Sequence, residues 1–515
     1  MGMTTATTAR RDPPLRSEGL PKRLLASGWT LAALAVVVAG RLPFVARPTS
    51  PDEGGYLLVG SQWHAGTSVY GDYWLARPPL LVGINELAAA LGGTFALRAI
   101  GLLAVVSSVL LAAAISREVS RAADAGAATV AQLAPMAVVA IFMTTPLFGT
   151  THVDGELLAA PFVLGGVLAF LRASAARDRA VAARWALVAG AAATSAAMVK
   201  QNSIDVFVFV AACLVVRLVQ GDRRPARRLA ALFAAGALAA AAVILGMAAL
   251  RGTGLGDLWD SVVTFRFQAA SEISSSAPDV NAVRLRTLVL AALASLAPVV
   301  VAVLAWQSRR GLSSRGARSS GLLDLRWPAY ALLAWEVVSV AGGGSYWLHY
   351  LLDLVPGITV LAVAAAQRPP SARRALTWTL AAAALSTGIA TGVDAVRGPD
   401  YASDAATIGY LRDHARPGDT AVVAFGHPNI LWDTRLTSPY EQLWSLPVRV
   451  RDPDLSELGG LLASPAAPTW VVVAGSDLYS WGISAGHADH LLEAGYHRVA
   501  VESPYVIWHV DGSPR

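Results

Sequence analysis

The sequence predicts a mainly α-helical, polytopic membrane protein with a small α/β domain at its C-terminal end. Of its 515 residues, 55% are hydrophobic and only 15% are charged, whereas a soluble domain has about 25% charged residues. Apolar runs of about 17–25 residues, long enough to cross a ~30 Å hydrocarbon core, recur along most of the chain. From Arg397 onward these runs shrink to strand length and alternate with short segments of helical periodicity.

Residues 1–23 are expected to form a polar cytoplasmic tail, and residues 24–394 a transmembrane domain of about eleven helices. The first span lacks a small-residue cleavage site, so we expect it to be retained as an anchor. The expected spans begin near Leu24, Phe95, Ala128, Val153, Trp185, Ile204, Leu229, Leu288, Trp327, Trp347 and Leu376.

The loops between these spans alternate in charge. Lys and Arg gather in the N-terminal tail and in every second loop, including LRASAARDRAVAAR, RLVQGDRRPARR and QRPPSARR. Because cytoplasmic loops carry the excess of basic residues, the N-terminus is expected in the cytoplasm, and an odd number of spans places the C-terminal domain outside. The net charge of +6 mostly reflects this topology, and the Arg residues form no single face for binding nucleic acid. The abundance of Ala and Arg fits a GC-rich bacterial genome, so we expect the bacterial plasma (inner) membrane.

Residues 395–515 are expected to fold as a small extracytoplasmic α/β domain. TAVVAFG and PTWVVVAGSD have strand length, and DAATIGYLRDHA and HADHLLEAGYHRV have apolar residues at helical spacing. The single cysteine, Cys213, lies inside an expected span, so no intramolecular disulfide can stabilise this domain. Its Trp and Tyr residues either form its core or stack on sugar rings, and we favour the core.

Two outer loops are long, residues 47–94 and 251–281. The first contains two amphipathic stretches, DEGGYLLVGSQWHAG and PPLLVGINELAAALGG, which are too short or too polar to span and are expected to lie in the plane of the membrane interface. The second contains RGTGLGD, which is similar to a phosphate-binding loop only superficially because no strand–helix unit surrounds it.

Ionisable and polar residues gather near the outer ends of the expected spans. Such groups are costly at membrane depth, so they tend to be paired, to line a wet cavity or to mark function. A carboxylate there can take a proton from an attacking hydroxyl, and Arg and Lys can hold a phosphate; both fit a substrate with a phosphate head and a lipid tail. The residues are Asp52, Glu53, Tyr56, Arg77, His152, Asp154, Glu156, Lys200, Gln201, Asn202, His349, Tyr350 and Asp353.

Each of these residues also has a simpler interpretation. Asp52 and Glu53 could be solvated loop acids. Arg77 could be an anchor whose head reaches the lipid headgroups, and Lys200 could be the polar end of a span. The His349–Tyr350 pair could belong to an aromatic belt.

The run DEGGYLLVGSQWHAGTSVYGDYWLARPPL resembles the first outer loop of the protein O-mannosyltransferase-like and aminoarabinose-transferase-like glycosyltransferases. These are polytopic GT-C enzymes that use polyprenyl-phosphate sugars. Their loop has an Asp-Glu pair, a Tyr shortly after it and a basic-Pro-Pro-Leu tail, matched here by Asp52-Glu53, Tyr56 and Arg77-Pro78-Pro79-Leu80. Arg98 opening the second span, Asp154 near the fourth and the His-Tyr-then-Pro pattern HYLLDLVP also match. The resemblance covers about residues 30–370.

Two positions depart from the family pattern. The basic residue before Pro-Pro is often Lys and is Arg here, and VKQN stands where several relatives have Lys followed by Gly-Pro. These two changes leave a phosphate-binding role open for Arg77 and Lys200, but their side chains need not be placed as in the family.

The resemblance implies transfer of a sugar from a polyprenyl-phosphate donor to a hydroxyl of an extracytoplasmic glycan, lipid or protein. Asp52 would be the general base, Glu53 would orient the loop or help bind acceptor or metal, and Tyr56 and Asp154 would contact sugar or acceptor or orient the loop. One displacement would invert the anomeric carbon, and because lipid phosphate leaves without being protonated, a single carboxylate suffices. The groups holding the lipid phosphate would be Arg77, Lys200, His349 and Tyr350.

The sequence requires no cofactor. Asp52 and Glu53 could bind a divalent cation, but no His and carboxylate spacing demands one. The Asp-x-Asp motif at Asp452-Pro453-Asp454 is interpreted as an acidic turn around Pro, not as the metal site of a nucleotide-sugar enzyme.

Two other classes of protein stay open. A transporter or flippase of a lipid-linked intermediate predicts paired halves with broken helices and a site near the midplane. A membrane scaffold with a glycan-binding outer domain would tolerate the loss of Asp52. We favour the glycosyltransferase because the sequence shows no internal repeat and its charges cluster at the outer rim.

Overall fold

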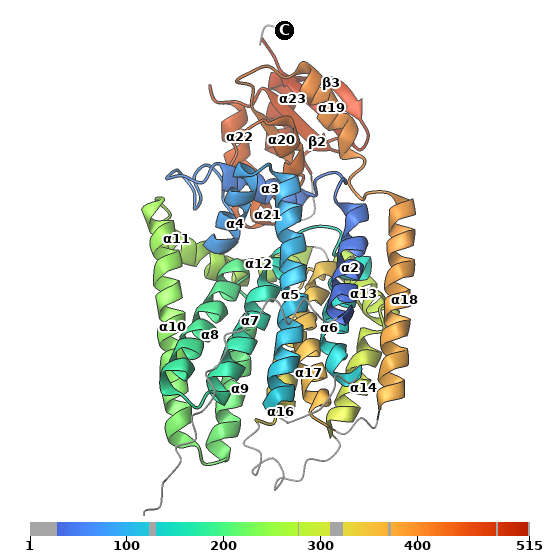
Figure 1. Cartoon of the computed structure of the whole chain (residues 1–515). Coiled ribbons are helices and arrows are strands. Elements are labelled where there is room, and N and C mark those ends of the chain that lie inside the picture. The colour runs from blue at the N-terminus through green and yellow to red at the C-terminus, as the bar shows by residue number, and fades with distance from the viewer. Residues whose placement is uncertain are drawn as a thin grey trace, which may run out of the picture.

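The structure is a computed structural model that describes residues 28–122, 130–276, 278–309, 323–368, 372–479 and 483–512. A bundle of long helices forms its larger part, and a small α/β domain sits on one end of the bundle (Figure 1). The expected polar tail, residues 1–23, lies outside the described residues.

Apolar helices build the bundle because, in lipid, a helix satisfies its own backbone hydrogen bonds. In the first half these are α2 (Gly28–Arg41), α5 (Thr94–Ala122), α6 (Val130–Phe142), α7 (Gly155–Ala175), α8 (Arg179–Val199), α9 (Asp205–Val219) and α10 (Arg223–Leu250). In the second half they are α13 (Pro278–Ala294), α14 (Ala297–Arg309), α16 (Arg326–Gly342), the 3₁₀ turn η4 (Leu348–Leu354) with α17 (Val355–Ala366), and α18 (Arg373–Arg397).

Each of the eleven expected spans coincides with one of these helices or, near Leu288, with the pair α13 and α14. Within the described ranges, six helices are long and apolar enough to cross a membrane, and α13 with α14 makes a seventh if this pair, bent by 56°, is one span. The others, α2, α6, α9 and α16, are shorter. The expected beginnings of α2 and α6, at Leu24 and Ala128, lie outside the described residues.

Small residues let α8 and α10 pack with their backbones in contact. A Cβ atom on Gly190 would lie 1.9 Å from the carbonyl oxygen of Phe233, and one on Gly236 would lie 2.0 Å from that of Leu187. Helices in lipid associate through such close van der Waals contact because the apolar surroundings give them no hydrophobic drive.

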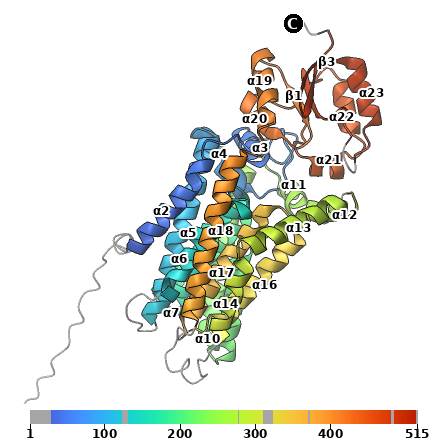
Figure 2. The same ribbon diagram turned by 90° about the vertical axis from the view of Figure 1, so that its right-hand side faces the viewer.

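The two amphipathic stretches of the first outer loop form α3 (Pro51–Ser61) and α4 (Pro79–Ala90). The expectation that both lie in the lipid interface is wrong for α3, because its residues from Glu53 to Gly60 are all buried. It lies between the bundle and the C-terminal domain (Figure 1). The second outer loop forms α11 (Leu255–Trp259), the π turn η3 (Asp260–Thr264) and α12 (Phe265–Ser276); α12 lies beneath the C-terminal domain in Figure 2.

The C-terminal domain has a four-stranded sheet in the order β1-β2-β4-β3, in which β1 pairs parallel with β2 and the other pairs are antiparallel. The two strands and two helices expected from the sequence are present as β1, β2, α19 and α23. The hairpin of β3 and β4 was not foreseen. The elements are α19 (Asp404–His414), β1 (Ala421–Ala424), α20 (Pro428–Thr434), α21 (Ser445–Arg451), α22 (Ser456–Leu462), β2 (Trp470–Ala474), α23 (Gly486–Gly495), β3 (Tyr496–Glu502) and β4 (Tyr505–Val510).

The aromatic residues of this domain have different surroundings. Trp470, Trp508 and Tyr440 are buried in its core, as favoured from the sequence, whereas Tyr479 is exposed, contrary to that interpretation. The Asp-x-Asp motif is a turn: Asp452 accepts hydrogen bonds from the Tyr440 hydroxyl at 2.9 Å and from the backbone N–H groups that open α22 at 3.0 and 3.1 Å. Trp444 instead leaves the domain and packs on α3.

Two glycines of α3 allow the C-terminal domain to dock. A Cβ atom on Gly54 would lie 2.4 Å from the Cα atom of Asn429, and one on Gly55 would lie 2.2 Å from the Trp444 ring. The loop after α3 adds a hydrogen bond from the Trp74 N–H to the Glu441 carbonyl oxygen at 3.1 Å. The Asp-Glu-Gly-Gly motif therefore both starts a helix and forms the surface on which the outer domain packs.

Replacing Gly54 by Ala is expected to weaken this docking, because the new methyl group meets backbone atoms that cannot move aside. Overpacking of this kind costs about 1–3 kcal/mol, so the midpoint of thermal unfolding of the purified protein should fall and proteolysis between the two parts should accelerate. Gly83→Ala is the matched control, since its Cβ would meet only one atom, 3.9 Å away. Equal stability of the two variants would contradict the docking role.

Candidate functional site

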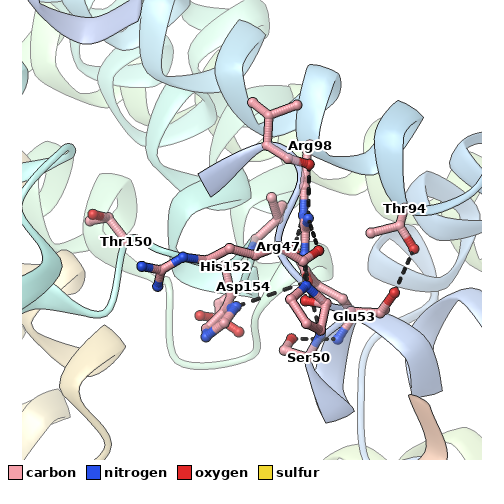
Figure 3. Close-up of polar contacts among 12 residues, drawn as sticks. Arg47, Ser50, Glu53, Thr94, Arg98, Thr150, His152 and Asp154 are labelled. Atoms are coloured by element: carbon pink, nitrogen blue, oxygen red, sulfur yellow. Dashed lines mark hydrogen bonds and ion pairs between the residues drawn. The ribbon is translucent and has the colours of Figure 1, made fainter. Parts of the chain in front are cut away.

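Glu53 is the buried anchor at the start of α3. Its carboxylate accepts hydrogen bonds from Arg98 Nη2 at 2.9 Å, from the Ser50 N–H at 3.1 Å and from the Val153 N–H at 3.1 Å. The Ser50 hydroxyl accepts the Glu53 N–H at 3.2 Å, which completes a capping box. His152 lies 4.0 Å from the same carboxylate. Figure 3 shows these groups converging from α3, α5 and the turn before α7.

Arg98 fixes the chain that leads into α3. It donates to the carbonyl oxygens of Val45, Arg47 and Pro48 at 2.9, 2.6 and 2.9 Å. Burial alone would raise the pKa of Glu53, but the charge and hydrogen bonds of Arg98 hold that pKa below its ordinary value. Both Glu53 oxygens are thus occupied by N–H donors, which supports the loop-orienting interpretation over a role in binding acceptor or metal.

Asp52, the preceding residue, faces a different space. It is partly buried and lines a cavity of about 190 Å³ together with Arg77, His349 and Tyr350. Trp444 of the C-terminal domain also lines this cavity, and its indole Nε1 donates to Asp52 Oδ1 at 3.0 Å. Burial raises the pKa of Asp52, and the negative charge of Asp154 raises it further. A raised pKa makes this carboxylate a stronger base than a solvated one.

Tyr56 and Arg77 hold each other on the wall of this cavity. Arg77 Nε donates to the Tyr56 hydroxyl at 3.0 Å, and the guanidinium carbon lies 5.7 Å from the centre of the Tyr56 ring. The Trp444 ring packs on Tyr56 with the ring centres 5.6 Å apart. Tyr56 therefore orients the Arg77 cation, and Arg77 is no free interfacial anchor.

A second group of charges surrounds His349. Its Nδ1 lies 3.4 Å from Asp154 Oδ2, and its Nε2 lies 3.6 Å from Glu156 Oε1. Glu156 also pairs with Lys200, whose Nζ lies 4.8 Å from the centre of the Tyr350 ring. Asp154 begins α7 as its N-terminal cap. These carboxylates fix the cations and the imidazole, so Asp154 has a positioning contact in addition to any contact with sugar.

A second cavity of about 390 Å³ adjoins the first, since Arg77, Arg266 and Tyr350 line both. It also contains Lys200. The rest of its lining combines an apolar wall from α12 and α16 with the polar side chains of Gln201, Asn202, Ser339 and Asp353. The apolar wall consists of Ala269, Ala270, Ile273, Trp335, Val338 and Gly342. Cations at one end and an apolar wall along the side would fit a phosphate with a lipid chain.

Arg266 and Trp444 are site residues that the sequence analysis missed. With the Gln201 amide assigned so that its oxygen faces Arg266, the guanidinium donates to that oxygen at 2.5 and 2.6 Å. The signal for Arg266 was a lone cation between two Phe residues in the second outer loop. No sequence signal distinguishes Trp444 from the other tryptophans of its domain.

A larger cavity of about 860 Å³ lies elsewhere between the bundle and the C-terminal domain. Its lining includes Arg98, Trp432 and Asp433 but none of the residues expected to act in catalysis or phosphate binding. Asp433 is engaged by the Thr49 hydroxyl at 3.1 Å. The expected chemical groups therefore lie at the two smaller, adjoining cavities, one of which is lined by Asp52. Among the residues that the structure describes, no group of three or more His, Cys, Asp or Glu side chains is arranged to hold a metal ion.

No protein-family model matches this sequence, and no curated protein is significantly similar to it. Solved structures are similar in fold. ArnT from Cupriavidus metallidurans bound to undecaprenyl phosphate superposes with a TM-score of 0.62 at 15% identity, over 95% of this chain and 100% of that one. The archaeal oligosaccharyltransferase AglB from Archaeoglobus fulgidus, in complex with an inhibitory peptide and a dolichol-phosphate, superposes with a TM-score of 0.55 at 13% identity, over 87% of this chain and 69% of that one.

Both neighbours are GT-C glycosyltransferases. The chain therefore has the GT-C fold, in agreement with the resemblance seen in its first outer loop, and is an integral membrane protein.

Glu53→Gln is expected to lower the free energy of unfolding by about 3–5 kcal/mol, because the amide brings an N–H₂ group among N–H donors and leaves Arg98 without its counter-charge. Thermal or denaturant unfolding in detergent measures this loss. Glu86→Gln breaks the ion pair with Arg251, in which both side chains are about one-third exposed, and should cost only about 0–1 kcal/mol. Equal losses would contradict the anchoring role of Glu53.

Proposed function

We propose that this protein is a membrane glycosyltransferase that moves a sugar from a polyprenyl-phosphate donor to a hydroxyl of an extracytoplasmic glycan, lipid or protein. One observation carries the proposal: the cavity of Asp52 adjoins a cavity that combines Arg77, Arg266 and Lys200 with an apolar wall. A base thus lies beside a place for an anionic, lipid-linked leaving group. The shared fold with ArnT, whose structure contains undecaprenyl phosphate, supports the class of donor.

In the proposed reaction, Asp52 accepts the proton of the acceptor hydroxyl as the oxygen attacks the anomeric carbon. The bond between that carbon and the phosphate oxygen breaks, and its electron pair leaves with the lipid phosphate. The attack comes from the face opposite the leaving group, so the configuration inverts. The cations stabilise the charge that grows on the phosphate, and therefore no second carboxylic acid has to protonate it.

The other residues support these steps. Tyr56 orients Arg77, and Asp154 and Glu156 position His349 and Lys200 at the phosphate end. Trp444 holds Asp52 with a hydrogen bond and covers the cavity, so the C-terminal domain completes the site. We assign the N-terminus to the cytoplasm and the C-terminal domain to the outer face of a bacterial plasma membrane, following the distribution of basic loops. The mechanism needs no metal ion, and addition of a chelator tests this.

Asp52→Asn is expected to lower the rate of sugar transfer by roughly 10²–10⁴-fold, the contribution of a general base, while donor binding and thermal stability stay near wild type. The measurement is release of lipid phosphate from a panel of polyprenyl-phosphate sugars by the purified protein. Asp72→Asn is the control, because Asp72 belongs to the same loop but is exposed. A fully active Asp52→Asn protein would exclude the mechanism and favour a scaffold or a flippase.

The pH dependence of kcat/KM should have an acid limb set by Asp52. The base must be ionised to act, so activity is lost as the pH falls through its pKa, and the raised pKa places this limb above the ordinary carboxyl range. Trp444→Phe removes a hydrogen bond that lowers the pKa of Asp52, so the limb should move to higher pH. A limb that stays in place, or moves down, would contradict this assignment.

Arg266→Gln is expected to weaken the apparent affinity for the donor by roughly 10–100-fold, the loss of one or two charge-assisted hydrogen bonds. The effect should appear in KM for the donor more than in KM for the acceptor. Arg498→Gln removes an exposed positive charge from the outer domain and should change neither. Unaltered donor affinity in the Arg266 variant would show that Arg266 does not bind the donor phosphate.

A further inference from the structure

A cluster of arginines lies at the end of the bundle opposite the site just described. Helix α7 runs away from Asp154 and ends at Ala175, and α8 begins at Arg179 and returns to Lys200. At about 1.5 Å per residue, these 21-residue helices span about 30 Å, the thickness of the hydrocarbon core. The end of α9 and the start of α10 lie at the same far end (Figure 1).

The loops at this end enclose a cavity of about 590 Å³. Five arginines line it, and among its described lining residues none is acidic. These arginines are Arg177, Arg179, Arg217, Arg224 and Arg228. Like charges that line one cavity reinforce each other's field and favour an anion there. The positive-inside pattern explains why basic residues occupy these loops, but not why five of them share one cavity.

The cavity has buried polar groups without partners. Arg217 Nη2 donates to the Ser174 carbonyl oxygen at 2.8 Å, but Arg217 Nε and the Ser174 hydroxyl are both buried without a hydrogen-bond partner. The acid nearest to Arg217 is Asp222, at 3.7 Å, whose side chain is 54% exposed. Buried donors left unsatisfied in this way are costly, and a bound acceptor would relieve that cost.

Another arginine at the same end of α7 behaves differently. Arg172 lies 3.6 Å from Glu118 and over the ring of Trp185 at 4.6 Å, so it is paired within the protein. It does not line the cavity. Arg172 is thus engaged by a partly buried acid and a ring, whereas the one acid that pairs with a cavity arginine, Asp222 with Arg217, is more than half exposed.

The shape of the cavity indicates the kind of anion. Arginine forks bind phosphate oxygens in pairs, and the walls also include the apolar side chains of Leu229 and Leu232 of α10. Basic pockets between spans at the cytoplasmic side bind phosphate headgroups of anionic lipids. We propose that this cavity binds the phosphate headgroup of an anionic phospholipid of the cytoplasmic leaflet, with an acyl chain along α10.

The test compares two pairs of exposed arginines in the full-length protein. Arg224→Gln with Arg228→Gln removes two charges from the cavity, and Arg373→Gln with Arg374→Gln removes two from the start of α18 at the same end. Native mass spectrometry in detergent measures binding of phosphatidylglycerol, with phosphatidylcholine, whose zwitterionic headgroup has no net charge, as the control. The cavity pair should bind phosphatidylglycerol roughly 30-fold more weakly than wild type, and the α18 pair should bind it normally.

Three results would overturn the proposal. Equal losses in both double variants would mean that only the overall charge matters. Binding of phosphatidylcholine as tight as that of phosphatidylglycerol would exclude recognition of an anionic headgroup. Displacement of phosphatidylglycerol by low millimolar inorganic phosphate would identify free phosphate as the ligand and exclude the lipid. None of these readouts depends on sugar transfer, so they stand apart from the proposed function.

Discussion

The buried ion pair between Glu53 and Arg98 is the contact on which the outer part of this protein depends. Arg98 belongs to a span, and through Glu53 and three backbone carbonyl groups it fixes the chain that starts α3. Because α3 carries Asp52 and Tyr56, the ion pair sets the position of the candidate base relative to the cations of the bundle. A buried pair of this kind contributes specificity of position more than net stability.

The C-terminal domain acts through the same helix. It rests on Gly54 and Gly55, where only a backbone without side chains leaves enough room, and it places Trp444 against Asp52 and Tyr56. The site is therefore assembled from three parts of the chain: the bundle, the first outer loop and the outer domain. An outer domain that only tethered the protein would not need to pack so closely on the helix that carries Asp52.

The sequence predicts the helical bundle well, because long apolar runs and alternating basic loops follow directly from the physics of the bilayer. It also predicts that Asp52, Arg77 and His349 share a site, because their order and membrane side match a known pattern. It does not predict Arg266 or Trp444. Each reaches the site only through the packing of an outer segment whose local sequence carries no chemical motif, and such contacts depend on tertiary structure alone.

The neighbouring acids of α3 have different surroundings because successive side chains on a helix point about 100° apart. Glu53 turns inward to the guanidinium of a span, whereas Asp52 turns to the open cavity. Exchanging the two residues would keep the composition and charge unchanged. An Asp at position 53 would be too short to reach Arg98, and a Glu at position 52 would extend further into the cavity. A shift of one position along the helix, rather than a difference in acidity, thus separates the anchoring carboxylate of Glu53 from the cavity-facing carboxylate of Asp52.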